Sequence, residues 1–279
     1  MNKLFVFFMA GMCLVVLFLG HARWKNMSEA AGIEGRKAAE VTLLKEKEER
    51  ETLINSLRPG NNKPQSLIDF LHYRALTQDK VKITVVGSNV TSGQGASSIS
   101  TSWPELLKKK LRSENADLES LSLDNHGYEG YSTSDLLNGN KIDLVINGNP
   151  DLVIFESSMI NNHFRSISIE QTKQDLESII AILQKELPNA KIYIMSPNPI
   201  VNAENKNSIE LTYLDYISAS EEVIRNNNWL YIDSYREIEK KLNEENILLV
   251  DILANDFVNP NDKGNMLWFE LLYEYFKKK

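Results

Sequence analysis

Cysteine is almost absent from this 279-residue chain, since Cys13 is the only one and lies inside an apolar N-terminal run. The rest of the chain has no thiol that could form a disulfide, so its stability must come from a packed core. Basic residues are in the minority: 31 Lys and Arg stand against 38 Asp and Glu, which gives a net charge of -7. No basic face is evident that would neutralise phosphates, and we therefore expect no nucleic-acid partner.

Metal-ligand and phosphate-loop patterns are missing as well. No cluster of His, Cys, Asp or Glu has the spacing of a metal site, and residues 93–95 (GQG) lack the Lys-Ser or Lys-Thr that ends a phosphate loop. We therefore expect no metal and no cofactor. With 42% hydrophobic and 25% charged residues, the chain can bury one substantial core.

A long apolar segment opens the chain. Lys3 precedes an almost unbroken apolar run over residues 4–20, and charged residues follow it within residues 21–25. This run is at the lower edge of the ~20 residues that a membrane span needs. It predicts a single anchor in the cell membrane with an exported domain, or a cleaved signal peptide and a secreted protein. Positive residues flank both ends, so charge does not fix the orientation in the membrane.

Residues 28–58 are rich in charges that alternate in sign at helical neighbour spacing, which predicts a solvated helical stalk. A few apolar residues, among them Val41 and Leu44, could form a weak seam for dimerisation, but no heptad is sustained and the oligomeric state stays open. Residues 59–64 (PGNNKP) break the helix. We expect residues 1–26 to form the anchor or signal, residues 27–65 the stalk and linker, and residues 66–279 the globular domain.

The globular part alternates short β-branched apolar runs with amphipathic helices, after a short amphipathic segment at 67–76. The predicted strands are 82–86, 118–123, 152–155, 191–195 and 230–232. The predicted helices are 103–113, 169–187, 211–226, 235–245 and 263–276. This alternation indicates βαβ crossovers and a mostly parallel sheet covered on both faces. Ligands of such sheets bind beyond the carboxyl ends of the strands.

Four blocks between residues 81 and 276 resemble, in order, the sequence blocks of the SGNH/GDSL hydrolase family. The first, GSNVT, is similar to the Gly-Asp-Ser-Leu block, with Ser88 at the Asp position and Asn89 at the position of the nucleophilic serine. The last, DFVNP, resembles the Asp-x-x-His-Pro block, with Asp256 retained and Asn259 at the histidine position. The resemblance implies a three-layer, flavodoxin-like α/β fold and the class of carboxylic ester hydrolases.

The two middle blocks resemble the parts of the family that form the oxyanion hole. In residues 125–133 (NHGYEGYST), Gly130 best matches the glycine whose backbone N–H is a donor to the oxyanion. Residues 151–156 (DLVIFE) lead to Asn161 at the family's Asn-Asp position, so the resemblance implies Asn161 as the side-chain donor. The backbone N–H of Asn89 would be a further donor.

The two asparagines at the nucleophile and base positions decide which chemistry remains. Serine hydrolysis needs a hydroxyl that attacks and a histidine that accepts its proton. Asn89 has no ionisable hydroxyl, and Asn259 cannot accept a proton near neutral pH. Loss of the nucleophile or base typically costs on the order of a million-fold in turnover. We therefore do not expect efficient ester hydrolysis by the family mechanism.

Other groups near the site could substitute for the lost ones. The hydroxyls beside Asn89 are Ser88, Thr91 and Ser92, which we interpret as turn residues that bond their own backbone. His126 and His163 follow predicted strand ends, so either is a replacement base or an ordinary loop histidine. Glu156 follows the third strand and, if buried, needs a hydrogen-bond partner or has a catalytic role.

Three hypotheses remain. The chain is a degenerate family member at the cell surface, kept for binding a small acyl ester or a carbohydrate-like ligand, with Asp256 paired to Asn259. Alternatively, it is an active esterase or acyltransferase with a rewired triad, or a purely structural membrane-anchored domain. An ester assay separates the first two, and ligand binding separates the first from the third. The ligand itself is not determined, because loops such as 195–208 select it.

Overall fold

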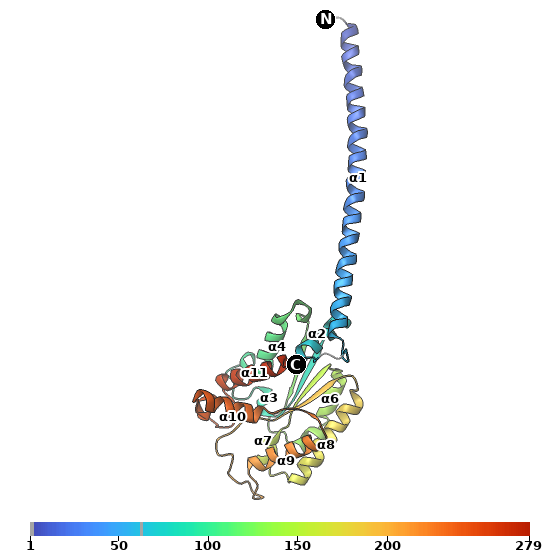
Figure 1. Ribbon diagram of the computed structural model, residues 1–279. Coiled ribbons are helices and arrows are strands. Elements are labelled where there is room, and N and C mark those ends of the chain that lie inside the picture. The colour runs from blue at the N-terminus through green and yellow to red at the C-terminus, as the bar shows by residue number, and fades with distance from the viewer. Residues whose placement is uncertain (1–2, 62–63) are drawn as a thin grey trace. The chain divides into compact units, whose positions relative to one another are not determined.

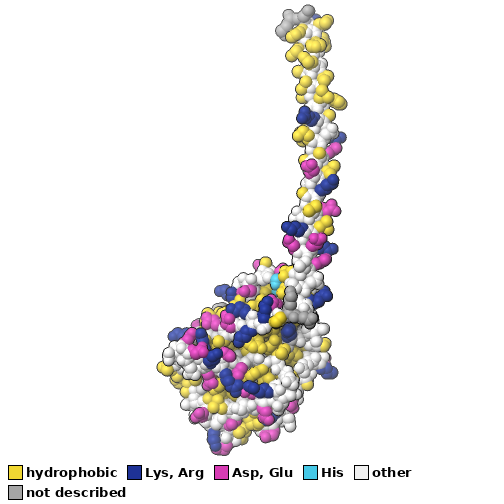
Figure 2. Space-filling view, viewed as in Figure 1, with side chains coloured by type: hydrophobic (Ala, Val, Ile, Leu, Met, Phe, Trp, Pro, Cys, Tyr) yellow, Lys and Arg dark blue, Asp and Glu magenta, His cyan; other side chains and the backbone are white. Residues whose placement is uncertain are grey.

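The computed structural model describes residues 3–61 and 64–279, and the chain divides into two compact units between Ser56 and Leu57. The first unit is part of one continuous helix, α1 (Lys3–Leu57), none of whose side chains is buried (Figure 1). Figure 2 shows hydrophobic side chains over its beginning and mixed charges along the remainder. By length and composition, α1 is apolar enough to cross a membrane. The charged segment predicted to be helical is helical as far as Leu57.

The second unit is built on a five-stranded parallel sheet in the order β2-β1-β3-β4-β5. Its strands are β1 (Lys82–Gly87), β2 (Ser122–Gly127), β3 (Leu152–Glu156), β4 (Lys191–Met195) and β5 (Leu230–Ile232). Every residue of the central strand β3 is buried, as its unbroken apolar sequence favours in a sheet covered on both faces. The predicted α/β fold with a parallel sheet is confirmed.

Helices cover both faces of this sheet (Figure 1). One face carries α2 (Leu67–Thr77), α4 (Trp103–Glu114), α10 (Ser234–Glu245) and α11 (Asp262–Lys277). The other carries α5 (Thr133–Asn138), α6 (Lys141–Gly148), α8 (Ile169–Glu186) and part of α9 (Tyr213–Asn226). Short helices follow in the loops: α3 (Asn89–Ser92), α7 (Met159–Phe164), η1 (Ile99–Thr101), η2 (Ala116–Leu118) and η3 (Leu249–Ile252).

Each face of the sheet has its own hydrophobic core. On the first face, the rings of Trp103 in α4 and Trp268 in α11 stack with centroids 5.7 Å apart, and both are fully buried. On the second face, the fully buried Phe155 of β3 belongs to the cluster formed with α6 and α8. Aromatic side chains contribute large apolar areas, so these residues anchor the three layers.

The second strand differs from its predicted position. We expected a strand at 118–123, but β2 begins at Ser122, and Leu118 ends the 3-10 helix η2. Leu118 and Leu121 are both fully buried because this turn directs them into the first core, so their apolar character does not mark a strand. The other predicted strands and the long helices are confirmed within one to two residues. The short helices α5, α6 and α7 were not predicted.

Candidate active site at the carboxyl edge of the sheet

The sheet reverses its direction of winding between β1 and β3, and the loops that leave these two strands diverge there. Asn89 begins α3 directly after β1, and Asn161 lies in α7 directly after β3. Gly130 lies in the loop after β2, the other neighbour of β1. Such a reversal leaves a crevice at the carboxyl ends of the strands, where ligands of open α/β sheets bind.

The side chain of Asn89 contacts both residues that the resemblance assigns to the oxyanion hole. Its Oδ1 accepts a hydrogen bond from the backbone N–H of Gly130 at 2.7 Å and another from Nδ2 of Asn161 at 3.0 Å. Gly130 has φ of 72°, a left-handed conformation that glycine adopts without strain. The two donors are therefore converged on one point, and an amide oxygen of the chain itself occupies that point.

The partners of these donors keep them in place. Nδ2 of Asn161 also donates to the carbonyl oxygen of Tyr131 at 2.9 Å. The carbonyl of Gly130 accepts from Nη1 of Arg165 at 3.2 Å, and Nε of Arg165 lies 3.4 Å from a carboxylate oxygen of Asp135. In contrast, no described residue accepts a hydrogen bond from Nδ2 of Asn89, whose side chain is partly exposed. Its N–H groups remain available to an acceptor outside the chain.

Asn162 is a positioning residue that the sequence analysis did not single out. It is fully buried, and its Oδ1 accepts from the backbone N–H of Thr133 at 2.9 Å. Its Nδ2 donates to the hydroxyls of Thr133 at 2.9 Å and Thr172 at 3.0 Å. These bonds join α7 to α5 and α8, and so fix the loop of Gly130 relative to Asn161. The sequence signal that could have identified Asn162 is its place directly after Asn161, at the second position of the family's Asn-Asp pair.

Asp256 and Asn259 form a compact pair before α11. Nδ2 of Asn259 donates to Oδ2 of Asp256 at 2.7 Å, and the backbone N–H groups of Val258 and Asn259 both reach Oδ1 at 2.9 Å. Burial acts to raise the pKa of Asp256, but these hydrogen bonds outweigh it and hold the pKa below its usual value. Oδ1 of Asn259 is buried and has no hydrogen-bond partner among the described residues.

Gly95 brings the loop of Asn89 against the loop of Asn259. The backbone N–H of Gln94 donates to the carbonyl of Asn89 at 3.0 Å, and Gly95 follows with φ of 93°. A Cβ at Gly95 would lie 2.8 Å from Cβ of Asn259 and 2.6 Å from the carbonyl oxygen of Pro260. Only glycine permits this close approach. The structure thus gathers the predicted site residues at one edge of the sheet.

Glu156 lies beneath the turn of Asn89 and is fully buried. Its Oε2 accepts from the backbone N–H of Ser88 at 2.7 Å, from the Ser88 hydroxyl at 2.6 Å and from the Thr91 hydroxyl at 3.3 Å. Its Oε1 accepts from the backbone N–H of Ser158 at 2.9 Å. Burial raises the pKa of Glu156, although these hydrogen bonds oppose the rise. The structure gives this carboxylate a structural hydrogen-bonding role.

These bonds correct the interpretation of the neighbouring hydroxyls. We expected all of them to bond their own turn backbone, but Ser88 and Thr91 donate to Glu156, because its carboxylate is the buried acceptor at hand. Ser92 behaves as expected, since its hydroxyl donates to the carbonyl of Asn89 at 2.7 Å. Among the described contacts, none of the three hydroxyls has a histidine as its partner, and the carboxylate of Glu156 is the one acidic group that Ser88 and Thr91 contact.

The two histidines considered as replacement bases have other surroundings. His126 lies within β2, and its Nδ1 is 3.2 Å from the hydroxyl of Tyr128. His163 is buried in α7, with its ring centroid 6.0 Å from that of Tyr213 and 5.8 Å from that of Tyr216. Burial lowers the pKa of both imidazoles. Among the described contacts, neither histidine hydrogen-bonds to a hydroxyl beside Asn89.

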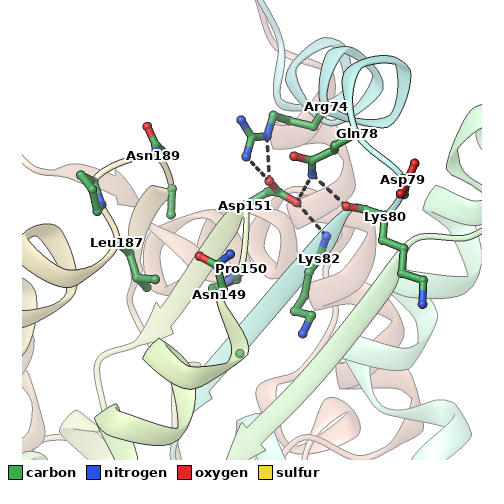
Figure 3. A pocket seen from close by; sticks show the side chains of 13 residues that line it. Arg74, Gln78, Asp79, Lys80, Lys82, Asn149, Pro150, Asp151, Leu187 and Asn189 are labelled. Carbon is green, nitrogen blue, oxygen red and sulfur yellow. Dashed lines mark hydrogen bonds and ion pairs between the residues drawn. The ribbon is translucent and has the colours of Figure 1, made fainter.

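A cavity of about 420 Å³ lies at the opposite, amino edge of the sheet (Figure 3). Its centre is Asp151, which accepts from Nε of Arg74 at 2.7 Å, from Nε2 of Gln78 at 2.8 Å and from the backbone N–H of Lys82 at 2.9 Å. These contacts tie the end of α2 to β1 and β3. The polar groups that contact Asp151 satisfy one another, and the cavity lies at the edge opposite to the predicted site residues, so it is not the candidate site. Among the described residues, no group of three His, Cys, Asp or Glu could hold a metal.

Comparisons with known proteins identify a family and a fold. The model of the GDSL-like lipase/acylhydrolase family matches residues 85–267. A GDSL-like lipase from Parabacteroides merdae is 16% identical with a TM-score of 0.59, over 71% of this chain and 96% of that chain. An acetyl xylan esterase is 19% identical with a TM-score of 0.56, over 70% of this chain and 98% of that chain.

A two-domain esterase active on acetylated mannans, crystallised with mannopentaose, is 16% identical with a TM-score of 0.55, over 70% of this chain and 48% of that chain. At these identities, the likeness to solved structures shows the fold alone. No curated protein matches the sequence.

Proposed function

Because this chain belongs to the GDSL-like lipase/acylhydrolase family, we propose that it is a degenerate member that binds a ligand at the family site without hydrolysing it. In this proposal, Asn89 stands at the nucleophile position, Asn259 stands at the base position, and Asp256 holds Asn259. Gly130 and Asn161 are the remaining oxyanion donors, with the backbone N–H of Asn89.

One observation carries the proposal. Oδ1 of Asn89 already accepts from Gly130 N–H at 2.7 Å and from Asn161 Nδ2 at 3.0 Å, the two donors that would have to stabilise an oxyanion. Catalysis requires these donors to face the charge that develops in the transition state. A carboxamide there supplies no nucleophile, and Asn259 cannot take up a proton near neutral pH. Both chemical groups are lost while the frame that held them persists.

The ligand class is supported by the family's relatives. The similar esterases are named for acetylated xylan and acetylated mannan, so we propose a small acyl ester or a carbohydrate-like molecule as the ligand of this chain. The site offers amide donors and acceptors, which suit neutral polar ligands.

We also propose that the protein works at the outer surface of the cell membrane. The apolar part of α1 would be a single anchor, and a signal peptide cleaved near residue 26 is the alternative. Residues 1–26 would then be the anchor or signal, residues 27–65 the charged stalk and linker, and residues 66–279 the binding domain.

An ester assay on the full-length protein in detergent tests the loss of hydrolysis. We expect wild type to release p-nitrophenol from p-nitrophenyl acetate no faster than an Asn161→Ala variant, since Oδ1 of Asn89 already engages both donors of the hole. Wild type that is clearly faster than this variant would contradict the proposal. It would favour an esterase or acyltransferase with a rewired triad.

A further inference from the structure

The space that an acyl carbonyl would need is already filled in this site. In an esterase, the carbonyl oxygen of the substrate receives the hydrogen bonds of the oxyanion hole. Here Oδ1 of Asn89 receives them from Gly130 and Asn161. An acyl group that entered would find both donors engaged, so the acyl part of an ester contributes little to binding. What remains for recognition is the alcohol part.

Asn89, Asn198 and Asn259 each have an unpaired amide atom among the described residues, and of the three only Asn89 is partly exposed. Nδ2 of Asn89 has no acceptor among the described residues, and Oδ1 of Asn259 is buried without a donor. Oδ1 of Asn198, in the loop after β4, is also buried without a donor, while its Nδ2 donates to the carbonyl of Val258 at 2.8 Å. The open donor of Asn89 suits a ligand with hydroxyl groups, because a hydroxyl oxygen accepts a hydrogen bond.

The charges nearby do not favour an anion. Asp256 remains ionised near neutral pH because its pKa is below the usual value, and it has no basic partner within salt-bridge distance among the described residues. The cation nearest to the hole along the chain, Arg165, is engaged with Asp135 and with the carbonyl of Gly130. A negatively charged ligand would be repelled by Asp256, which argues against an anion, and the amide donor of Asn89 suits a neutral ligand with hydroxyl groups.

An exposed aromatic ring lies on the same loop as Asn259. Phe257 is 51% exposed and has φ of 58°, a left-handed conformation that is strained for a bulky side chain. Its backbone is held on both sides, since its N–H donates to the carbonyl of Ala254 at 2.9 Å and its carbonyl accepts from Val201 N–H at 3.1 Å. Strain of this kind persists where the surrounding structure imposes it, and it clusters at ligand sites.

From these observations we infer that the site binds an unacylated neutral saccharide, with Phe257 as the platform for a sugar ring and the amide of Asn89 as a donor to its hydroxyl oxygens. The inference rests on the proposed binding function and names its ligand class. The apolar face of a sugar ring packs on an aromatic ring, while one of its hydroxyl oxygens accepts from the amide of Asn89. The acyl group that the family's enzymes remove is not needed for recognition here.

The test uses full-length protein in lipid nanodiscs, titrated by calorimetry with xylo-, manno- and cello-oligosaccharides of six sugars, each with and without O-acetylation. We expect at least one unacetylated oligosaccharide to bind, and its acetylated form to bind no more tightly. We expect Asn89→Ala to vacate the hole and shift the preference toward the acetylated form. Acetylated sugar bound about tenfold more tightly by wild type, a difference of 1.4 kcal/mol, would overturn the inference.

Phe257→Gly separates a binding role from a structural one. Glycine adopts the left-handed conformation without strain, so the variant should melt at or above the temperature of wild type. Removal of the platform should nevertheless weaken saccharide binding by about tenfold or more, as for a central aromatic contact. Leu144→Ala, at a 45% exposed position on α6, is the control and should leave binding unchanged.

The outcomes distinguish the inference from the proposed function. Binding of acetylated sugar alone, without turnover, would refute the inference and leave the binding function in place. Release of acetate would refute the binding function itself. No binding by any of the oligosaccharides, or full binding by Phe257→Gly, would refute the inference.

Discussion

Nδ2 of Asn259 lies 2.7 Å from Oδ2 of Asp256, and the backbone N–H of Asn259 lies 2.9 Å from the other carboxylate oxygen. An aspartate in a catalytic triad orients its histidine through the same kind of bond. Asp256 therefore still holds the side chain at the base position in one orientation, although that side chain cannot accept a proton. On the other side of the site, Gly130 and Asn161 still converge on one oxygen. In the proposed function, these contacts are the frame of the family site, and Asn89 and Asn259 stand where the reacting groups would be.

The double change Asn89→Ser with Asn259→His should therefore create esterase activity. It supplies the two missing groups to a frame in which Asp256 and the two hole donors are in place. We expect the double variant to exceed wild type by on the order of a hundred-fold on p-nitrophenyl acetate, and each single variant to gain far less, because nucleophile and base act as a unit.

Addition of Asn161→Ala to the double variant is the control and should abolish the gain. A folded double variant without activity would show that the frame has moved by an amount that catalysis does not tolerate, about an ångström. Wild type as active as the double variant would point to a nucleophile other than Asn89.

Phe155→Ala should destabilise the globular unit by ~3–5 kcal/mol, because it leaves a cavity in the core. Phe155 is fully buried on the central strand, in the core opposite to that of Trp268. Phe164→Ala, at a 55% exposed position, is the matched control and should cost below ~1 kcal/mol. Urea unfolding of a chain without residues 1–26 measures the free energy of unfolding of both variants. Equal losses of stability would contradict the assignment of Phe155 to the core.

Glu156→Gln should change the pH dependence of stability. Burial raises the pKa of Glu156 in the folded state. Its contribution to stability is therefore fully present below the unfolded value of about 4.3 and is lost as pH rises through the folded value. The variant carries no such loss, so we expect wild type to lose stability relative to Glu156→Gln as pH rises from 4 to 8.

Thermal melts across this pH range provide the measurement. Glu177→Gln, at an exposed carboxyl on α8, is the control, and the difference between its melting temperature and that of wild type should not change with pH. A wild-type advantage over Glu156→Gln that grows with pH would contradict the buried position of the carboxylate.

Full-length protein should partition with membranes, and deletion of residues 1–26 should release a soluble, folded domain. The expectation rests on the apolar beginning of α1, none of whose side chains is buried. Membrane fractionation followed by carbonate extraction measures it, and Val15→Arg with Val16→Arg should weaken the association, since charge at the centre of a span is costly. Intact protein found in the soluble fraction would contradict the anchor.

The sequence determined most of the framework of this protein. Short runs of β-branched apolar residues predicted β1, β3, β4 and β5, because buried parallel strands need nearly continuous apolar residues. Residue chemistry alone excluded Asn89 as a nucleophile and Asn259 as a base, because neither amide ionises in the required way. The apolar run at the N-terminus and the charged helix after it could also be predicted from the sequence, since both depend on local composition.

Only the tertiary structure decided what the amides do. The bond from Gly130 to Asn89 spans 41 residues and the bond from Asn161 spans 72, and no local pattern encodes such a contact. The predicted start of β2 was wrong for a related reason. Leu118 is buried in a 3-10 turn, and an apolar residue indicates burial but not whether a strand or a turn buries it. Sequence identifies which groups are present, and the distances between distant segments determine which of them meet.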